Sequence, residues 1–127
     1  MIDRNSVAAW LEAYVQAWKT YDPQAIGSLF GPDATYLYHP FDEEPVRGRD
    51  AIVANWLENK DEPNTYDAHY EPIAVDGDTA VVNGRSRYFG PDGKTLTRIF
   101  DNIFVLRFDD QGLCIEFREW FMQPRGN

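Results

Sequence analysis

The sequence predicts an α+β fold, in which three helices in the first half of the chain pack on one face of a curved antiparallel or mixed sheet. Apolar residues recur at helical spacing in residues 6–21 and again, over shorter stretches, before residue 60. After that point, apolar and polar residues alternate in long segments that are separated by turns rich in Asp and Gly. Helices followed by an antiparallel meander are typical of α+β domains.

The composition fits one globular domain over residues 1–127. Hydrophobic residues make up 43% of the chain and aromatic residues 15%, which is enough for one core. Twelve basic and 21 acidic residues give a net charge of −9, which argues against nucleic acid or an anionic membrane as partner, because phosphate contacts need a basic patch. The sequence holds one cysteine, Cys114, and shows no secretory signal or membrane-spanning run. We therefore expect a cytoplasmic protein without a disulfide.

The first helix is predicted over residues 6–21 because its apolar side chains form one stripe. That stripe consists of Val7, Trp10, Leu11, Tyr14, Val15 and Trp18. A second, short helix begins with Asp22 as its cap and Pro23 at its first position. The other predicted elements are a strand at 34–39, a loop at 41–47, a helix at 48–59, strands at 66–75 and 80–89, and a ribbon at 96–122.

The ribbon consists of two long strands joined by an Asp- and Gly-rich turn at residues 109–112. Each arm is about twice the usual strand length of ~5–6 residues, so strand twist bends the ribbon and gives it a concave face. Alternation places on that face Arg98, Phe100, Asn102, Phe104, Leu106, Phe108, Ile115, Phe117, Glu119 and Phe121. Because Asn102 and Glu119 interrupt an aromatic row, the pattern predicts a pocket and not a plain core.

Three stretches of the chain resemble the nuclear transport factor 2-like superfamily. They are YVQAW with DPQAIGSLFGPDATYLYHP, then EEPVRGRDAIVANWL, and finally RIFDNIFVLRFDDQGLCIEFREWF, which is similar to the closing hairpin of SnoaL-like proteins. The superfamily includes SnoaL-like polyketide cyclases, ketosteroid isomerases, limonene epoxide hydrolases and scytalone dehydratases. The resemblance implies a cone, or cystatin-like α+β roll, whose helices close a curved sheet around one cavity, and a homodimer.

Compared with the ketosteroid isomerases, the chain keeps one functional position and changes two. Tyr14 stands where that family has a tyrosine that donates to the substrate oxyanion. His39, before Pro40, stands where the family has its aspartate base, and Phe104 replaces the second oxyanion donor. The resemblance therefore does not imply steroid isomerisation.

Four residues are predicted to carry chemistry. Tyr14 is either a cavity phenol that donates to an oxyanion or a core tyrosine. His39, with an ordinary pKa of ~6.5, is either the proton carrier at the cavity mouth or an exposed side chain that binds a loop. Glu119 is either a general acid or base, or the partner of Arg98, Arg85 or Arg87 in an ion pair, because a carboxylate among aromatic rings is costly when unpaired. Asn102 orients substrate or water, or else satisfies backbone at a bulge.

The aromatic residues expected to contact the ligand are Trp10, Trp18, Trp56, Phe100, Phe104, Phe117 and Phe121. Periodicity puts Arg85 and Arg87 on the outer face of their strand, although one bulge would reverse this. No residues have the spacing of a zinc site, a calcium loop or a phosphate-binding loop, so we expect neither metal nor cofactor.

Three hypotheses for function remain at this stage. The first is a cofactor-independent isomerase, cyclase, dehydratase or epoxide hydrolase that transfers a proton on a small apolar, oxygen-bearing molecule. The second is a non-catalytic protein that binds such a molecule. The third is a protein-interaction module. The outer sheet face, with Ile99, Ile103, Val105 and Trp120, gives weak support to a homodimer.

Overall fold

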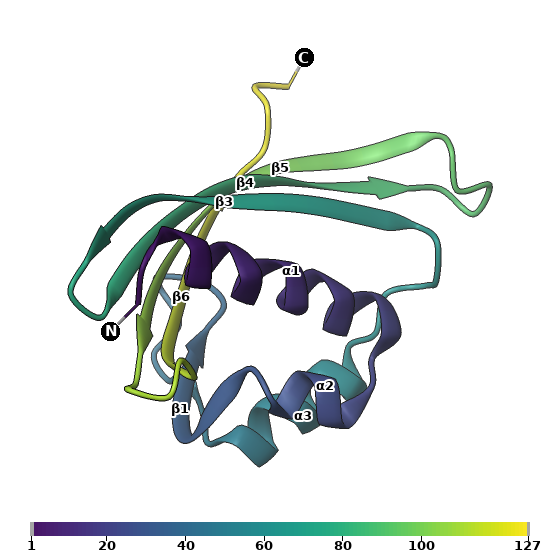
Figure 1. Ribbon diagram of the computed structural model, residues 1–127. Helices are drawn as coiled ribbons and strands as arrows, with labels where there is room; N and C mark the ends of the chain where they lie inside the picture. The colour runs from purple at the N-terminus through teal and green to yellow at the C-terminus, as the bar shows by residue number, and fades with distance from the viewer. Residues whose placement is uncertain (1, 127) are drawn as a thin grey trace.

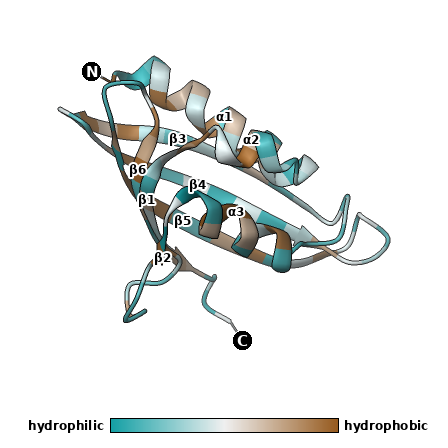
Figure 2. Ribbon diagram, turned by 90° about the horizontal axis from the view of Figure 1, so that it is seen from below, coloured by the Kyte–Doolittle hydropathy of each residue, from teal (hydrophilic) through white to brown (hydrophobic). Residues whose placement is uncertain are grey.

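The computed structural model describes residues 2–126 and confirms the predicted α+β architecture (Figure 1). Its helices are α1 (Arg4–Thr20), α2 (Pro23–Gly27) and α3 (Arg49–Glu58), and α1 and α3 lie within two residues of their predicted bounds. In Figure 2, α1 and α3 carry both hydrophilic and hydrophobic residues, as expected of helices with one buried side. None of the helices in residues 2–126 is long and apolar enough to cross a membrane.

The helices pack on one side of a six-stranded, curved sheet (Figure 1). Its strands are β1 (Phe30–Leu37), β2 (Val46–Arg47), β3 (Tyr66–Asp76), β4 (Thr79–Phe89), β5 (Leu96–Phe108) and β6 (Cys114–Met122). The strand order is β2-β1-β6-β5-β4-β3, and β1 runs parallel to β6 while all other neighbours are antiparallel. The sheet is therefore mixed, and α1 crosses its concave side, where it contacts β3.

Local sequence signals fix both ends of α1 and the start of α2. Asp3 and Ser6 form a capping box, in which each side chain accepts from the other residue's backbone N–H. Tyr21 ends α1 in the left-handed conformation, with φ of 51°. Asp22 then caps α2 by accepting from the Gln24 N–H. These caps turn the chain back under α1, so that both helices cover the same side of the sheet.

The β5–β6 ribbon has the predicted alternation over most of its length, but a bulge reverses it at the start of β6. Arg107 pairs with Glu116 and Phe108 with Cys114, so Ile115 is an extra residue in the ladder. The prediction that Ile115 faces inward was therefore wrong: Ile115 is only partly buried, whereas its neighbour Cys114 is fully buried.

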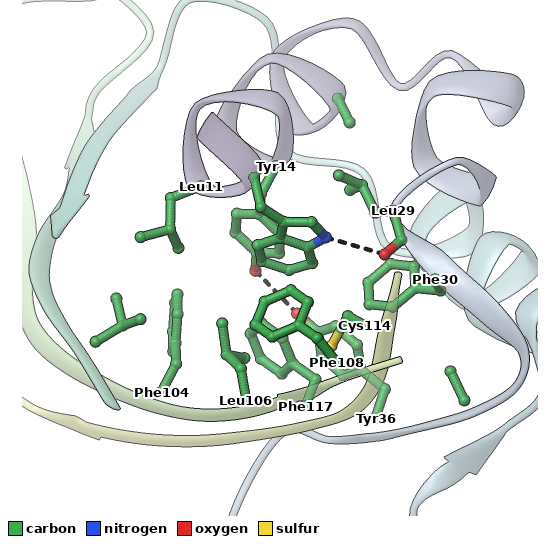
Figure 3. Packing of buried hydrophobic residues seen from close by; sticks show 14 of the residues in the cluster. Leu11, Tyr14, Leu29, Phe30, Tyr36, Phe104, Leu106, Phe108, Cys114 and Phe117 are labelled. Carbon is green, nitrogen blue, oxygen red and sulfur yellow. Dashed lines mark hydrogen bonds between the residues drawn. The ribbon is translucent and has the colours of Figure 1, made fainter. Parts of the chain in front are cut away.

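One half of the concave face is filled by a close-packed aromatic and aliphatic core (Figure 3). The Phe117 ring stacks on Tyr36 with centroids 4.1 Å apart and contacts Phe104 at 4.8 Å. Trp10 packs edge-on against Phe30 and Phe108, and its indole N–H donates to the Leu29 carbonyl oxygen at 2.9 Å. This core anchors α1 to the sheet and lies next to the candidate site.

Candidate functional site

The other half of the concave face borders a pocket of about 580 Å³ that lies among α1, α3 and strands β1 and β3–β6. Its aromatic walls consist of Tyr14, Trp18, Tyr21, Tyr36, Tyr38, Trp56, Tyr70, Tyr88, Phe100 and Phe121. Its polar lining consists of Asn55, Asn59, Asp61, Ser86, Arg98, Asn102 and Glu119. Ligand pockets of proteins are commonly ~300–1,000 Å³, so this one fits a small organic molecule.

Two buried phenols share a single hydrogen bond on the inner wall of this pocket. The hydroxyl oxygens of Tyr14 and Tyr36 lie 2.9 Å apart, as Figure 3 shows. One hydroxyl donates to the other, so one O–H of the pair is left to donate elsewhere. Burial raises the pKa of both phenols well above the usual value, so both keep their protons at neutral pH. The pair is thus a ready hydrogen-bond donor.

A short polar chain crosses the concave face next to these phenols. The Ser86 hydroxyl donates to the Asn102 amide oxygen at 3.0 Å, and the Asn102 amide nitrogen donates to a Glu119 carboxylate oxygen at 3.0 Å. Asn102 is buried, with 4% of its surface exposed. Because both ends of its amide are occupied, Asn102 holds the Glu119 carboxyl in one orientation.

The Glu119 carboxyl is desolvated by burial and forms no ion pair with any of residues 2–126. Burial raises its pKa from 4.5 to about 7, against a smaller lowering effect of the Asn102 hydrogen bond. The expected alternative of an ion pair is not found within residues 2–126. Arg85 pairs with Asp101 and Arg87 with Asp67 on the outer face, as periodicity predicted for both arginines. Glu119 is therefore poised to gain or lose a proton near neutral pH.

Five tyrosines surround Glu119 closely enough for its charge to act on them. Burial is the main cause of the raised pKa of Tyr14, Tyr36, Tyr38, Tyr70 and Tyr88, and the Glu119 charge raises all five further. Tyr38 is held in place because its hydroxyl donates to the Asn55 side-chain oxygen at 2.6 Å. The arrangement is one carboxyl facing several protonated phenols across an aromatic pocket.

The structure shows the second of the two alternatives for His39, an exposed side chain that binds a loop, and His39 does not line the pocket. His39 is exposed in the turn after β1, and its Nδ1 accepts from the Phe41 N–H at 3.2 Å. Alternation explains the exposed position of His39: Tyr36 and Tyr38 point inward, so the next residue points outward. The His39 ring contacts Phe121, a lining residue, with centroids 5.8 Å apart, and thus stands beside the rim.

The predicted ligand-contacting aromatic residues divide into two groups. Trp18, Trp56, Phe100 and Phe121 line the pocket together with the predicted Tyr14, Asn102 and Glu119. Trp10, Phe104 and Phe117 do not line it, which corrects their expected contact with a ligand, because they are buried in the packed half of the concave face.

Comparison with known proteins agrees with this architecture. The model of the SnoaL-like domain matches residues 11–117. The chain belongs to the SnoaL-like family. This confirms the resemblance inferred from the sequence, although no curated protein matches the chain.

Solved structures share the fold of this SnoaL-like protein at low sequence identity. An NTF-2 like protein of unknown function from Burkholderia xenovorans LB400 is 18% identical, with a TM-score of 0.71 over 97% of this chain and 88% of that one. An LEH-like epoxide hydrolase of M. tuberculosis is 18% identical (TM-score 0.68, 94% and 84% covered). A proposed ketosteroid isomerase from Kribbella flavida DSM 17836 is 17% identical (TM-score 0.70, 98% and 84%). At these identities the likeness shows the fold alone.

Sequence reasoning missed several lining residues of the SnoaL-like pocket. Tyr36 lies on β1 and Tyr38 directly after its end, and the same alternation that places Ala34 inside would have identified both. Tyr70 faces Gly84 across the β3–β4 ladder, and a Cβ at Gly84 would clash with its ring, so this glycine makes room for it. Asp61 lies in the segment between α3 and β3, where no periodicity signals it.

No group of three or more His, Cys, Asp or Glu side chains within residues 2–126 is arranged to hold a metal ion. Cys114 is buried, and burial raises the pKa of its thiol. Among the described residues, the titratable groups that line the pocket are the carboxyls of Glu119 and Asp61, the tyrosine phenols and the guanidinium of Arg98.

Proposed function

We propose that this SnoaL-like protein is a cofactor-independent enzyme that moves a proton within a small, largely apolar carbonyl compound. One observation carries the proposal: Glu119, a desolvated carboxyl with no ion-pair partner among residues 2–126, lies in one pocket with a phenol pair that has one O–H free to donate. The names of two structures with this fold point to an epoxide and a ketosteroid as the molecules on which those proteins act. They support a small oxygen-bearing substrate here.

In the proposed reaction, Glu119 acts first as a general base and then as a general acid. Its carboxylate takes a proton from the carbon next to the substrate carbonyl, and the electron pair of that C–H bond moves into an enolate. The Tyr14–Tyr36 pair donates a hydrogen bond to the enolate oxygen, whose negative charge grows during this step. Protonated Glu119 then returns the proton to the same or a conjugated carbon, so that the product is an isomer of the substrate.

The pKa of Glu119 suits this double role. A group whose pKa lies near the working pH exists in both protonation states and transfers protons with little driving force lost. The value of about 7 meets that condition, whereas an ordinary glutamate at ~4.3 would return a proton less readily. Asn102 is proposed as a positioning residue, because its amide orients the carboxyl toward the pocket.

A non-catalytic ligand-binding protein is the second candidate. The outward position of His39 favours it, since only one of the two expected proton carriers faces the pocket. A protein-interaction module receives less support, because that hypothesis expects a filled cavity. We further propose that the protein is cytoplasmic and forms a homodimer through the outer sheet face, where Trp120 is 37% exposed.

Deuterium exchange tests the proposed function directly. The protein is incubated in D₂O with a panel of cyclic ketones and β,γ-unsaturated ketones, and incorporation of deuterium next to the carbonyl is followed by NMR. We expect exchange of at least one compound to fall by about 10²-fold or more in Glu119→Gln and by about 10-fold or more in Tyr14→Phe.

The matched control is Arg85→Gln, a change on the outer face of the sheet, which should leave exchange unchanged. Exchange that is equal in Glu119→Gln and the wild-type protein would exclude Glu119 as the base. Binding of these ketones without any exchange would favour the non-catalytic candidate.

A further inference from the structure

Arg98 places a positive charge at the outer end of the pocket. It lies opposite Tyr88 in the β4–β5 ladder and on the same face of β5 as Phe100 and Asn102. Its guanidinium carbon lies 4.5 Å from the centre of the Tyr88 ring and 5.9 Å from that of Phe100. Both rings line the pocket, so these cation–π contacts hold the guanidinium at its wall.

The charge of Arg98 is not neutralised by any carboxylate within residues 2–126. Three other arginines of the sheet, Arg85, Arg87 and Arg107, form ion pairs with aspartates at 3.2, 2.8 and 3.3 Å. Arg98 forms no such pair among the described residues, although the chain has 21 acidic side chains and a net charge of −9. The guanidinium fork of Arg98 is therefore free to bind an anion.

Asp61 is the other charged residue that lines this end of the pocket within residues 2–126, and the protein engages one of its carboxylate oxygens. An Asp61 carboxylate oxygen accepts from the Trp18 indole N–H at 3.1 Å and from the Tyr21 hydroxyl at 3.5 Å. At the outer end of the pocket, Arg98 thus offers a ligand the N–H donors of its guanidinium group. Because Asp61 lines the same pocket, a singly charged carboxylate fits this end better than a doubly charged phosphate.

We propose that the substrate of this site is a keto acid whose carboxylate binds Arg98 while its carbonyl group meets Glu119 and the phenol pair. The carbonyl end rests on the proposed function, whereas the carboxylate end rests on Arg98 alone. Asn102, which holds Glu119, is four residues from Arg98, a span of about 14 Å along the strand, so the apolar body between the two groups is on the order of 10 Å long. Phe100 and Tyr88 line the path between them.

The test compares 9-oxodecanoate with its amide, two probes of nearly the same shape, of which only the first is charged. Binding is followed by the fluorescence of Trp18 and Trp56, which line the pocket, or by calorimetry. The wild-type protein should bind the carboxylate about 10-fold more tightly than the amide, since hydrogen bonds to a charged group are the stronger ones. In Arg98→Met this preference should fall to about one, with the affinity for the amide unchanged.

Two further variants test whether the preference for the carboxylate probe comes from Arg98 itself or from positive charge on the protein in general. Arg85→Met removes an equal charge from the outer face of the sheet and should keep the preference, while Arg98→Lys should keep part of it. Equal binding of the two probes, a preference that survives Arg98→Met, or no binding of either probe to the wild-type protein would overturn the proposal. A preference that Arg85→Met also abolishes would do the same.

The preference for the carboxylate probe is a binding property and does not depend on catalysis. Glu119→Gln should retain the preference for the carboxylate even though it lacks turnover. If the preference depends on Arg98 but no ketone exchanges deuterium, the carboxylate site stands and the proposed reaction fails. If exchange depends on Glu119 but the two probes bind equally, the reaction stands and the carboxylate site fails.

Discussion

The two halves of the concave sheet face are built from the same alternating strands, yet one is solid and the other is open. In the packed half, Phe104, Phe117 and Trp10 interlock with few polar atoms. In the open half, most aromatic rings carry hydroxyl groups, and Glu119 and Asn102 stand among them. Curvature alone therefore does not make the pocket. The pocket lies where polar atoms must find partners, because those atoms prevent the rings from closing into a dry core.

The two halves should differ most in how much stability is lost when a phenylalanine is replaced by alanine. Phe117 is fully buried between Tyr36, Tyr14 and Phe104, so Phe117→Ala should lower the free energy of unfolding by about 3–5 kcal/mol. Phe100→Ala, which widens the pocket and leaves no sealed cavity, should lower it by less than about 1 kcal/mol. Urea denaturation of both variants measures this, and equal losses would remove the distinction between the halves.

The open half should also make stability depend on pH in a way that the packed half does not. Burial raises the pKa of Glu119 from 4.5 to about 7, so the folded state binds the proton more tightly than the unfolded state. Keeping Glu119 ionised in the folded state therefore lowers the free energy of unfolding. This loss is absent below about pH 4.5, grows as the pH rises and is complete above about pH 7, where it reaches about 3 kcal/mol.

The free energy of unfolding, measured between pH 5 and 8, should therefore fall more steeply in the wild-type protein than in Glu119→Gln. The variant removes the titrating group but keeps an oxygen for Asn102. Parallel curves for the two proteins would mean that Glu119 is not desolvated.

The sequence predicted the elements of both halves better than it predicted which half is filled. Alternation correctly placed Asn102 and Glu119 inward on β5 and β6, and Arg85 and Arg87 outward on β4. However, Phe104 and Phe100 share a residue type and a strand face, and only the position of α1 decides that one is core and the other is pocket wall. That position is a property of tertiary packing and cannot be read from periodicity.

Two side-chain placements at strand ends have local causes. The bulge at Ile115 shifts the phase of β6 by one residue, and nothing in the alternating sequence marks it. His39, which the resemblance to an isomerase suggested as a proton carrier at the cavity mouth, does not line the pocket, because Tyr38 holds the inward position directly after β1. In both cases, a shift of one residue along the strand decides on which face of the sheet a side chain lies.

A smaller effect on stability is expected at Gly84, where the pocket wall needs a residue without a side chain. A Cβ at Gly84 would overlap the Tyr70 ring and the His69 backbone, so Gly84→Ala should cost about 1–3 kcal/mol of stability and move Tyr70 out of its place in the pocket wall. Thermal or urea denaturation measures the loss. Gly90→Ala, where the added atom meets only ordinary contacts, is the matched control and should change stability by less than about 0.5 kcal/mol. Gly84→Ala with the stability of the wild-type protein would show that the two strands do not need this close approach.

The most direct test of the site is a titration of the Glu119 carboxyl itself. With ¹³C-labelled glutamate, the side-chain carboxyl resonance of Glu119 is assigned by its absence in Glu119→Gln and followed between pH 3 and 9. A midpoint near pH 7 is expected, because the carboxyl is desolvated and lacks a cationic partner within residues 2–126. A midpoint near the ordinary value of ~4.3 would show a solvated or paired carboxylate and would contradict its proposed role as the group that takes and returns the proton.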